Sequence, residues 1–268
     1  MYPYDIIAGI DLYTVAICIG IIACFFVFSR LSDKKKFSSR LHNLILISGI
    51  GGIGLGLFSS MLFQALYNIS SRGEFVMDSE TGATFYGGLI GGAVCYLLIY
   101  FALGHFYVKD RSHLTGFFDM AACVAPAIAV AHGFGRVGCL MAGCCHGSVT
   151  DSWCGIMMHG NMGYGKYIPV QLFEAIFLFA LAAVLVFLAT KDKKGVFSIY
   201  LAAYGIWRFF IEYARDDYRG ETFIKALTPS QLTAIVLILV GAGLFAAEYF
   251  LAKRKKPCGD IREERSGE

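Results

Sequence analysis

Long apolar runs, rather than alternating apolar and polar positions, dominate the chain. Seven such runs are separated by more polar segments, and they approach or exceed the roughly 20 residues that a helix needs to cross a bilayer. The lack of strict alternation favours helices over the strands of a membrane barrel. The predicted spans are residues 10–28, 41–67, 86–108, 114–139, 170–190, 196–213 and 232–252. The pattern therefore predicts an all-α, polytopic integral membrane protein with about seven transmembrane helices.

The composition agrees with a membrane protein and excludes several other classes. Of the 268 residues, 57% are hydrophobic and 16% are charged, and the mean hydropathy is +0.61. Soluble proteins carry about 25% charged residues. A chain this apolar cannot cover a water-facing surface, which excludes a soluble enzyme or a disordered protein. The net charge of +3 is too small to suggest polyanion binding, so we expect no nucleic-acid partner.

Basic residues predict the orientation of the chain in the membrane. Most of the 23 Lys and Arg residues fall in one alternate set of segments, at 30–40, 108–113, 191–195 and from 253 onward. Because basic segments stay on the cytoplasmic side, we expect the N-terminus outside and the C-terminus in the cytoplasm. An odd number of spans fits this parity. We therefore predict a single transmembrane domain over residues 1–252 and a charged cytoplasmic tail over residues 253–268.

Glycine is frequent in the second and third predicted spans. Residues 49–54 match the dinucleotide-binding fingerprint in letters, but they lie inside a predicted span with no preceding strand, so we reject that interpretation. Small residues in a span normally allow two helices to pack closely. The same interpretation holds for the glycine pairs at 87–88 and 91–92.

Several ionisable side chains lie within or at the ends of the spans, where a charge costs several kcal/mol unless it is paired or used. They are Asp119, His132, Arg136, Glu174, Arg208 and Glu212. Their spacing places some of them on shared helix faces, together with other polar residues. These sets are His132 with Arg136, Gln171 with Glu174, and Tyr204 with Arg208, Glu212 and Arg215.

Two interpretations of these charges are open. In the first, they form structural ion pairs, Arg208 with Glu212 or Glu174, and Arg136 with another acid. In the second, two guanidinium groups from different helices bind a phosphate through forked hydrogen bonds, and the acids orient them. In a membrane protein, that phosphate would belong to a phospholipid head group.

Residues 135–147 close the fourth span and open the longest outer loop, which runs to about residue 168. They read Gly-Arg-Val-Gly-Cys-Leu-Met-Ala-Gly-Cys-Cys-His-Gly. Four glycines around Arg136 predict a backbone that bends sharply at the membrane surface. Backbone amides freed at such a bend could help to bind an anion. The loop is poor in charge, which suggests that it folds onto the membrane face.

This segment resembles the signature of the prolipoprotein diacylglyceryl transferases, Gly-Arg-x-Gly-Asn-x-x-Asn-Gly-Glu-x-x-Gly. Three further segments resemble family motifs in the right order. Residues 87–91 resemble the third-span motif, residues 169–174 resemble Pro-x-Gln-Leu-Tyr-Glu, and residues 204–213 resemble Tyr-Gly-x-x-Arg-Phe-x-x-Glu. The resemblance covers most of the chain.

The resemblance implies a reaction and its partners. The donor would be phosphatidylglycerol, the acceptor a cysteine thiol of a prolipoprotein signal peptide, and the location the bacterial cell (inner) membrane. Arg136 and Arg208 would stabilise the phosphate, Glu174 and Glu212 would orient them, and neither cofactor nor metal is required. The implied substrate-binding residues are Arg136, Gly138, Cys139, Cys144, Gly147, Gln171, Glu174, Tyr204, Arg208 and Glu212.

The chain departs from the family pattern at polar positions. Cys139, Ala142 and Cys144 stand where the signature has Asn, Asn and Glu, and Tyr86 replaces a histidine. Tyr86 is a candidate proton acceptor, although a pKa near 10 makes tyrosine a poorer base at neutral pH. His132 and His146 are alternative bases. A transferase with a different acceptor, and a lipid-binding or transport protein without catalysis, therefore stay open.

The chain has nine cysteines, of which four lie in the outer segment near His146 and His159. These four are Cys139, Cys144, Cys145 and Cys154. A disulfide that pins the loop, free thiols that pack it, a zinc or other metal site, and a catalytic thiol that accepts a lipid group are all open interpretations. Four other cysteines in spans are expected to pack as small apolar residues. Cys258 lies in the tail and is expected to be reduced.

Overall fold

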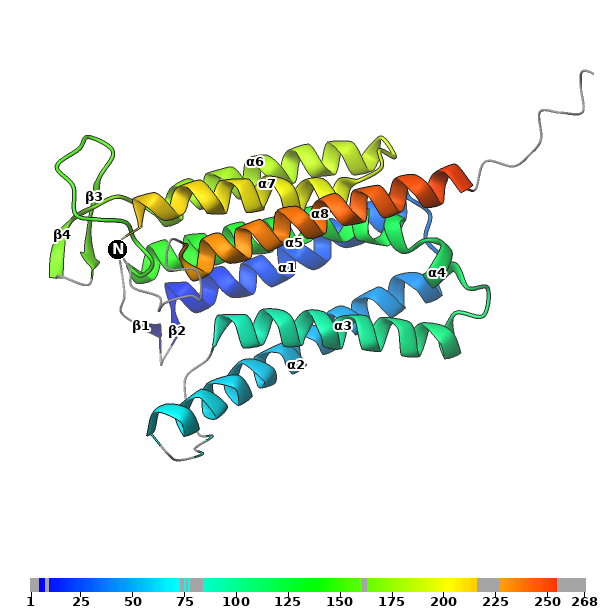
Figure 1. The fold of residues 1–268 in the computed structure, drawn as a ribbon, viewed down its shortest axis with the longest axis horizontal. Coiled ribbons are helices and arrows are strands. Elements are labelled where there is room, and N and C mark those ends of the chain that lie inside the picture. Colours follow the sequence, from blue (N-terminus) through cyan, green and yellow to red (C-terminus); the bar gives the residue numbers. More distant parts are fainter. Residues whose placement is uncertain are drawn as a thin grey trace, which may run out of the picture. The chain divides into compact units, whose positions relative to one another are not determined.

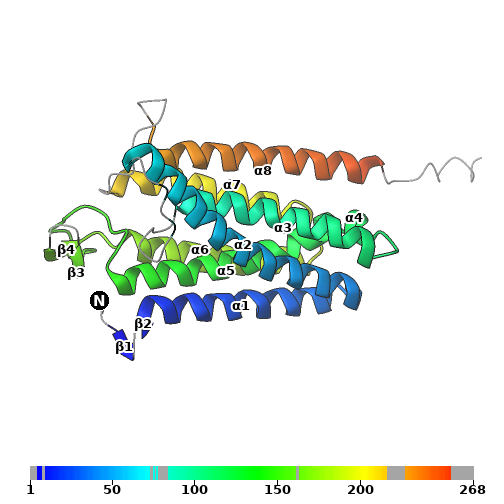
Figure 2. The ribbon, with the colours of Figure 1, turned by 90° about the horizontal axis from the view of Figure 1, so that it is seen from below.

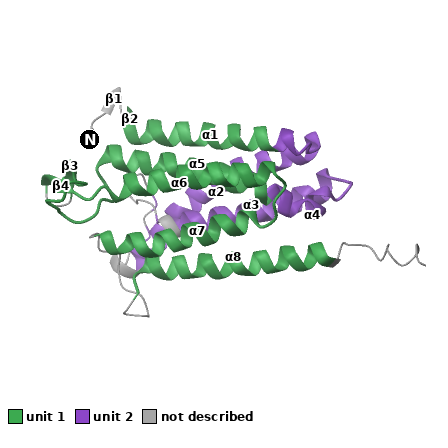
Figure 3. Ribbon diagram, turned by 90° about the horizontal axis from the view of Figure 1, so that it is seen from above, with its two compact units in different colours: residues 1–31, 121–268 green, residues 32–120 purple. Residues whose placement is uncertain are grey.

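The structure is a computed structural model that describes residues 5–7, 10–72, 75, 77, 84–160, 163–215 and 227–254. The chain forms two compact units (Figure 3). One unit comprises residues 1–31 and 121–268, and the other comprises residues 32–120. The single domain over residues 1–252 stays a prediction, and the tail beyond residue 254 lies outside the described residues.

Seven long helices occupy the places of the seven predicted spans. They are α1 (Leu12–Lys34), α2 (Ser39–Arg72), α3 (Phe85–Tyr107), α5 (Phe117–Ala142), α6 (Val170–Thr190), α7 (Val196–Ile211) and α8 (Pro229–Arg254). Six of these are long and apolar enough to cross a membrane, whereas α7 has only 16 residues. The helical membrane fold is therefore confirmed. The number of crossings and the orientation stay predictions.

The remaining elements are short. A single turn of helix, α4 (Ser112–Thr115), precedes α5, so the fourth long helix begins three residues later than the predicted span. Strands β1 (Asp5–Ile7) and β2 (Ile10–Asp11) form one antiparallel pair, and β3 (Ile156–Gly160) and β4 (Gly163–Tyr167) form another. The sequence analysis predicted no strands. These pairs satisfy backbone hydrogen bonds in segments that no helix covers.

In the unit of residues 32–120, α2 and α3 pack closely through small residues (Figure 1). A Cβ added at Gly56 would lie 3.0 Å from the Cα of Gly92. The hydroxyl of Ser60 donates a hydrogen bond to the carbonyl oxygen of Thr84 at 3.0 Å. Larger side chains would hold these backbones apart, so the close-packing interpretation of the glycines is confirmed.

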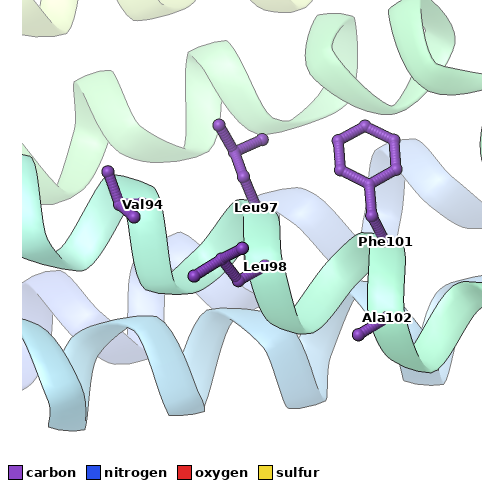
Figure 4. A pocket seen from close by; sticks show the side chains of 5 residues that line it. All are labelled: Val94, Leu97, Leu98, Phe101 and Ala102. Carbon is purple, nitrogen blue, oxygen red and sulfur yellow. The ribbon is translucent and has the colours of Figure 1, made fainter.

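The α3 helix also carries a shallow apolar pocket (Figure 4). Its lining consists of Val94, Leu97, Leu98, Phe101 and Ala102. All five side chains are apolar, so this pocket offers no group that would orient a polar head group. An apolar surface of this kind is typical of a helix that faces lipid.

In the other unit, α5 is the most buried of the candidate spans and packs on α1 and α6 (Figure 2). A Cβ at Gly138 would lie 3.0 Å from Cδ2 of Tyr13 on α1. The rings of Phe134 and Phe179 bring α5 and α6 together with centroids 5.2 Å apart. The neighbouring helices α7 and α8 approach closely at Gly205. Its place in the fold allows no side chain, because a Cβ there would lie 2.8 Å from the carbonyl oxygen of Ala234.

The outer loop folds back onto this bundle. Leu140 at the end of α5, Met158 of β3 and Tyr167 of β4 form a small buried core. The hairpin of β3 and β4 lies at the end of the unit where α5 and α7 finish and α6 and α8 begin (Figures 1 and 2). Four helix ends and the loop therefore meet in one region.

Candidate active site

A buried carboxylate forms the centre of this region. Glu174 on α6 has no exposed surface, and its Oε2 lies 3.0 Å from Nε of Arg136 on α5. The hydroxyl of Tyr204 on α7 donates a hydrogen bond to Oε1 at 2.9 Å. Nε2 of His132 lies 4.0 Å from the same oxygen. The helices α5 and α7 thus bring three polar groups to one carboxylate on α6, which compensates the cost of burying its charge.

The second arginine has its own acid. Nη2 of Arg208 on α7 lies 2.9 Å from Oε2 of Glu212 and donates a hydrogen bond to Ser230 at 2.9 Å. Nη1 is buried and has no hydrogen-bond partner among the described residues. A buried donor left unpaired costs about 1–3 kcal/mol. Arg208 therefore retains a donor that an anionic oxygen could satisfy.

The ion pairs that the sequence allowed are present, with Arg136 joined to Glu174 and Arg208 joined to Glu212. The positive charges of both arginines act on the Glu174 carboxylate. The two guanidinium groups therefore belong to one electrostatic cluster, although they come from different helices. Phosphate binding by this cluster stays a prediction.

The predicted continuous helix face from Tyr204 to Arg215 is wrong in its second half. The α7 helix ends at Ile211, and Glu212–Ala214 forms a 3-10 turn, η1. Arg215 is extended and pairs with Gly147 in an isolated β-bridge. Its Nε still lies 3.9 Å from Oε2 of Glu212, because the tighter turn keeps these side chains close.

The start of α8 supplies two polar residues that the sequence analysis missed. The backbone N–H of Thr228 donates to Oε1 of Gln231, and the backbone N–H of Gln231 donates to Oγ1 of Thr228, at 3.1 and 3.2 Å. This is a capping box, with Pro229 at the first helical position. The Thr228 hydroxyl also donates to Glu212 at 3.0 Å. The signal was present as Thr-Pro-Ser-Gln at residues 228–231.

Two predicted substrate-binding residues hold the loop in the structure, and a third packs against a neighbouring helix. Gln171 is fully buried, and its Nε2 donates to the carbonyl oxygen of Cys144 at 3.0 Å. The Gly147 N–H donates to the carbonyl oxygen of Ile168 at 2.8 Å, and a Cβ at Gly147 would overlap the carbonyl oxygen of Ala214. Gly138 lies against α1, as described above. Substrate contact by these residues stays a prediction.

The remaining candidates lie elsewhere. His146 is buried in the loop, with Nδ1 2.8 Å from the carbonyl oxygen of Gly147 and its ring against Tyr167. Asp119 forms an ion pair with Lys35 at 3.0 Å, within the unit of residues 32–120. Tyr86 lies on α3 in that same unit, and its side chain is outside the described residues. Its role as a base is a prediction.

The predicted bend is present within residues 135–147, but it does not come at Arg136. The α5 helix continues through Gly135 and Gly138 to Ala142, and its backbone amides there are used within the helix. The turn comes at Gly143, which has φ +72°. The Cys144 N–H donates to the carbonyl oxygen of Cys139, and the Gly143 N–H donates to that of Leu140, at 3.1 and 3.2 Å. These two bonds define a Schellman motif.

This turn brings three of the four loop cysteines together. The Sγ atoms of Cys139, Cys144 and Cys145 all lie within 4.8 Å of one another. Cys154 lies apart, with Sγ 3.1 Å from the hydroxyl oxygen of Ser152. In the structure, Cys139, Cys144, Cys145 and Cys154 form no disulfide, so the disulfide interpretation of this loop is not supported. Cys258 lies outside the described residues.

The surroundings shift the pKa values of Cys144 and Cys145 in opposite directions. Hydrogen bonds from Cys139 and Cys144 lower the pKa of Cys145, and the positive charge of Arg215 acts in the same direction. Hydrogen bonding with its neighbours raises the pKa of Cys144 instead, and burial acts in the same direction. Of Cys144 and Cys145, the surroundings therefore favour the thiolate form of Cys145, beside the Arg215 guanidinium.

Comparisons with known proteins agree with the motifs. The family described as prolipoprotein diacylglyceryl transferase matches residues 5–247. A phosphatidylglycerol–prolipoprotein diacylglyceryl transferase of Clostridium tetani is 32% identical over 244 residues, which cover 89% of this chain and 93% of that relative. A protein of Clostridium perfringens, named phosphatidylglycerol–prolipoprotein diacylglyceryl transferase 2, is also 32% identical, over 89% of this chain and 92% of its own length. The chain therefore belongs to the prolipoprotein diacylglyceryl transferase family.

Proposed function

We propose that this chain transfers the diacylglyceryl group of phosphatidylglycerol to the thiol of a cysteine in a prolipoprotein signal peptide. The names of its relatives state this donor and acceptor. The helical membrane fold suits both substrates, because one is a lipid and the other carries an apolar segment. We infer a location in the bacterial cell membrane from these relatives, and the distribution of basic residues supports an N-terminus outside.

The reaction is a displacement at carbon. The acceptor sulfur forms a bond to the glyceryl carbon that carries the phosphate ester. The carbon–oxygen bond breaks, its electron pair goes to the phosphate oxygen, and glycerol phosphate leaves. The thiol proton passes to a base. The phosphate changes from about one negative charge to about two, so groups that bind the second charge lower the barrier.

Two arginines on different helices, Arg208 buried and Arg136 largely buried, are the observation that carries this proposal. The unpaired Nη1 of Arg208 would donate to a phosphate oxygen, and Arg136 would add a second positive charge. Glu174 and Glu212 would hold the two guanidinium groups in position before substrate binds. Such preorganised donors need no rearrangement as charge develops. His132 is the candidate base within this cluster, with Nε2 3.5 Å from the Tyr204 hydroxyl.

A transfer assay tests the proposal. Purified protein would receive labelled phosphatidylglycerol and a peptide that carries a lipoprotein signal-sequence cysteine. We expect a thioether product, and we expect Arg136→Ala and Arg208→Ala each to lower kcat by about 100-fold to 1,000-fold. Arg30→Ala is the matched control, because Arg30 is an exposed arginine of the same unit. Full activity in both active-site variants would reject the role of the arginines.

The same assay separates the other functions. The replacement of the family's Asn and Glu by Cys139 and Cys144 favours a different acceptor as the second candidate function. Release of glycerol phosphate only with another thiol compound or another nucleophile would support that function. Lipid binding without turnover of any acceptor would support a lipid-binding or transport protein and would reject catalysis.

A further inference from the structure

Three thiols converge at the end of α5 because of the local backbone. Cys139 lies in the last turn of the helix. The Schellman motif reverses the chain directly after it, which brings the thiols of Cys144 and Cys145 back over the helix end. Residues this close in sequence would lie apart if the helix simply continued. The thiol cluster of Cys139, Cys144 and Cys145 is therefore a product of the turn.

The turn is fixed from several sides. A Cβ at Gly143 would lie 2.6 Å from the carbonyl oxygen of His159 in β3, so the hairpin packs directly on it. The buried side chain of Gln171 holds the Cys144 carbonyl from α6. Cys145 has φ +61°, a conformation that a non-glycine residue adopts only when its surroundings enforce it. The three sulfur atoms are thus held in place before any ligand arrives.

We propose that Cys139, Cys144 and Cys145 bind one zinc ion through three thiolates, and that the fourth coordination position takes the acceptor thiol. Thiolate sulfur is the preferred ligand type for soft metal ions such as zinc. Zinc–sulfur bonds of about 2.3 Å in a tetrahedral site imply sulfur–sulfur distances of about 3.8 Å. Sulfur atoms that already lie within 4.8 Å of one another need to move by about 1 Å or less.

The charge around the cluster suits this ion. Three thiolates and one Zn²⁺ carry a net charge of about minus one. The Arg215 guanidinium, which is hydrogen-bonded to Cys145, offsets that charge. A hydrogen bond to a ligating atom of this kind typically stabilises and orients a metal ligand. Cys154, in contrast, has only a hydroxyl group as its described neighbour at 3.1 Å.

The site is open at its fourth position. Among the residues that the structure describes, no further Cys, His, Asp or Glu joins the three sulfur atoms. Structural zinc sites usually have four protein ligands, whereas catalytic sites have three and an open position. The Cys144 thiol is exposed, which provides a path for the ion and for an incoming ligand. The cluster thus has the ligand count of a catalytic site.

The thiol cluster lies beside Arg136, and this location suggests which ligand takes the fourth coordination position of the zinc ion. The assignment of the acceptor thiol to that position rests on the proposed function. Cys139 follows Arg136 by one helical turn, and the charges of Cys139 and Cys145 act on the Arg136 guanidinium. A thiol at the fourth position would therefore lie next to the proposed phosphate site. Metal coordination keeps a thiol in its thiolate form at neutral pH. The reaction then requires only a weak base.

The proposed reaction needs no oxidant or reductant. Three cysteine thiols release their protons to solvent as the ion binds. The acceptor thiol replaces a water molecule and releases one more proton. Its sulfur then forms the bond to the glyceryl carbon, while the carbon–oxygen electron pair leaves with the phosphate. The product thioether is neutral, so it binds the ion less strongly and water returns.

Metal analysis of untagged protein, purified with reductant and without chelator, tests the site itself. We expect one zinc per chain, and X-ray absorption should show three sulfur neighbours at about 2.3 Å. Cys144→Ser and Cys145→Ser should lose the zinc, whereas Cys154→Ser, a loop cysteine outside the cluster, should retain it. Gly143→Ala keeps all three thiols but disturbs the turn, so its zinc affinity should fall by about 10-fold to 100-fold.

The zinc site would be overturned if reduced wild-type protein contained no zinc, or if the Cys144→Ser variant retained its zinc. A disulfide within the cluster, found in protein kept under reductant, would also overturn it. Binding of Cu⁺ but not Zn²⁺ would also reject zinc as the ion. These outcomes do not depend on activity, so they are separate from any failure of the transfer assay.

Cobalt substitution tests the acceptor position. A signal-sequence peptide with its cysteine should change the visible spectrum of the cobalt protein, and the same peptide with serine should not. Equal spectra with both peptides would reject acceptor coordination but leave the metal site intact. Full transfer activity in protein shown to contain no metal would reject the catalytic role, even if the proposed function holds.

Discussion

Glu174→Gln tests the buried cluster most directly, because the change removes one charge and almost no volume. The Glu174 carboxylate is fully buried and lies 3.0 Å from Nε of Arg136. Glutamine keeps an oxygen that can accept the hydrogen bond from Tyr204. It leaves the guanidinium of Arg136, which is also largely buried, without its counter-ion. The variant therefore isolates the ion pair from the packing.

The magnitude follows from burial. Removal of one partner of a buried ion pair costs about 3–5 kcal/mol. Since the hydrogen bond from Tyr204 survives, we expect a loss near the lower end, about 3 kcal/mol. At about 2–4 °C per kcal/mol, Tm should fall by about 6–12 °C. If Glu174 also orients Arg136, kcat should fall by about 100-fold while KM changes less.

Thermal unfolding in detergent and steady-state transfer kinetics measure the two effects. Glu248→Gln is the matched control, because Glu248 accepts a backbone N–H from Gly195 at 2.9 Å and lies near the end of α8 that is opposite to Ser230 and Gln231. The double variant Glu174→Gln, Arg136→Gln removes both charges and should recover stability, because neutral pairs avoid the cost of an unpaired buried charge. It should not recover activity. Equal Tm and kcat for Glu174→Gln and Glu248→Gln would refute the reasoning, and an active double variant would refute the role of Arg136.

Two further predictions concern packing around the site and in the other unit. Thr228→Ala removes the cap of α8 and the hydrogen bond to Glu212, so Tm should fall by the equivalent of about 1–2 kcal/mol. Thr228→Ser keeps both contacts and should melt like the wild type, and an unchanged Tm for the alanine variant would contradict the capping role. Gly56→Ala should lower Tm, because its Cβ would lie 3.0 Å from the Cα of Gly92. Gly54→Ala meets nothing within 4 Å and should be neutral or slightly stabilising, so equal effects at both positions would contradict close packing of α2 on α3.

Helix positions followed from the sequence because span length and hydropathy are properties of single segments. The seven apolar runs all became long helices, with ends shifted by a few residues. The α7 helix is shorter than its apolar run, since the chain tightens into a 3-10 turn at Glu212. The strands β3 and β4 gave no apolar alternation to detect. Their residues pair because the returning loop must satisfy its own backbone groups.

The residues of the charged cluster could be predicted from the sequence, but the ion pairs that they form could not. Helical spacing placed His132 with Arg136 on one face, and that relation depends only on the helix period. Which acid meets which arginine depends on how α5, α6 and α7 are rotated against each other, and no local pattern contains that rotation. The sequence therefore left Glu174 and Glu212 as alternative partners for Arg208, whereas the structure assigns Glu212 at 2.9 Å.

The cysteines show a different limit. Their spacing matched no familiar metal pattern, so the sequence left a disulfide, packing, a metal and a catalytic thiol as open alternatives. The missing information was the conformation of Gly143, which the sequence analysis treated as one of several glycines in a general bend. A single left-handed residue directly after the end of α5 decides which thiols meet. It also separates Cys154 from the cluster. The chemistry available at this end of the bundle therefore depends on one backbone angle as much as on the thiols themselves.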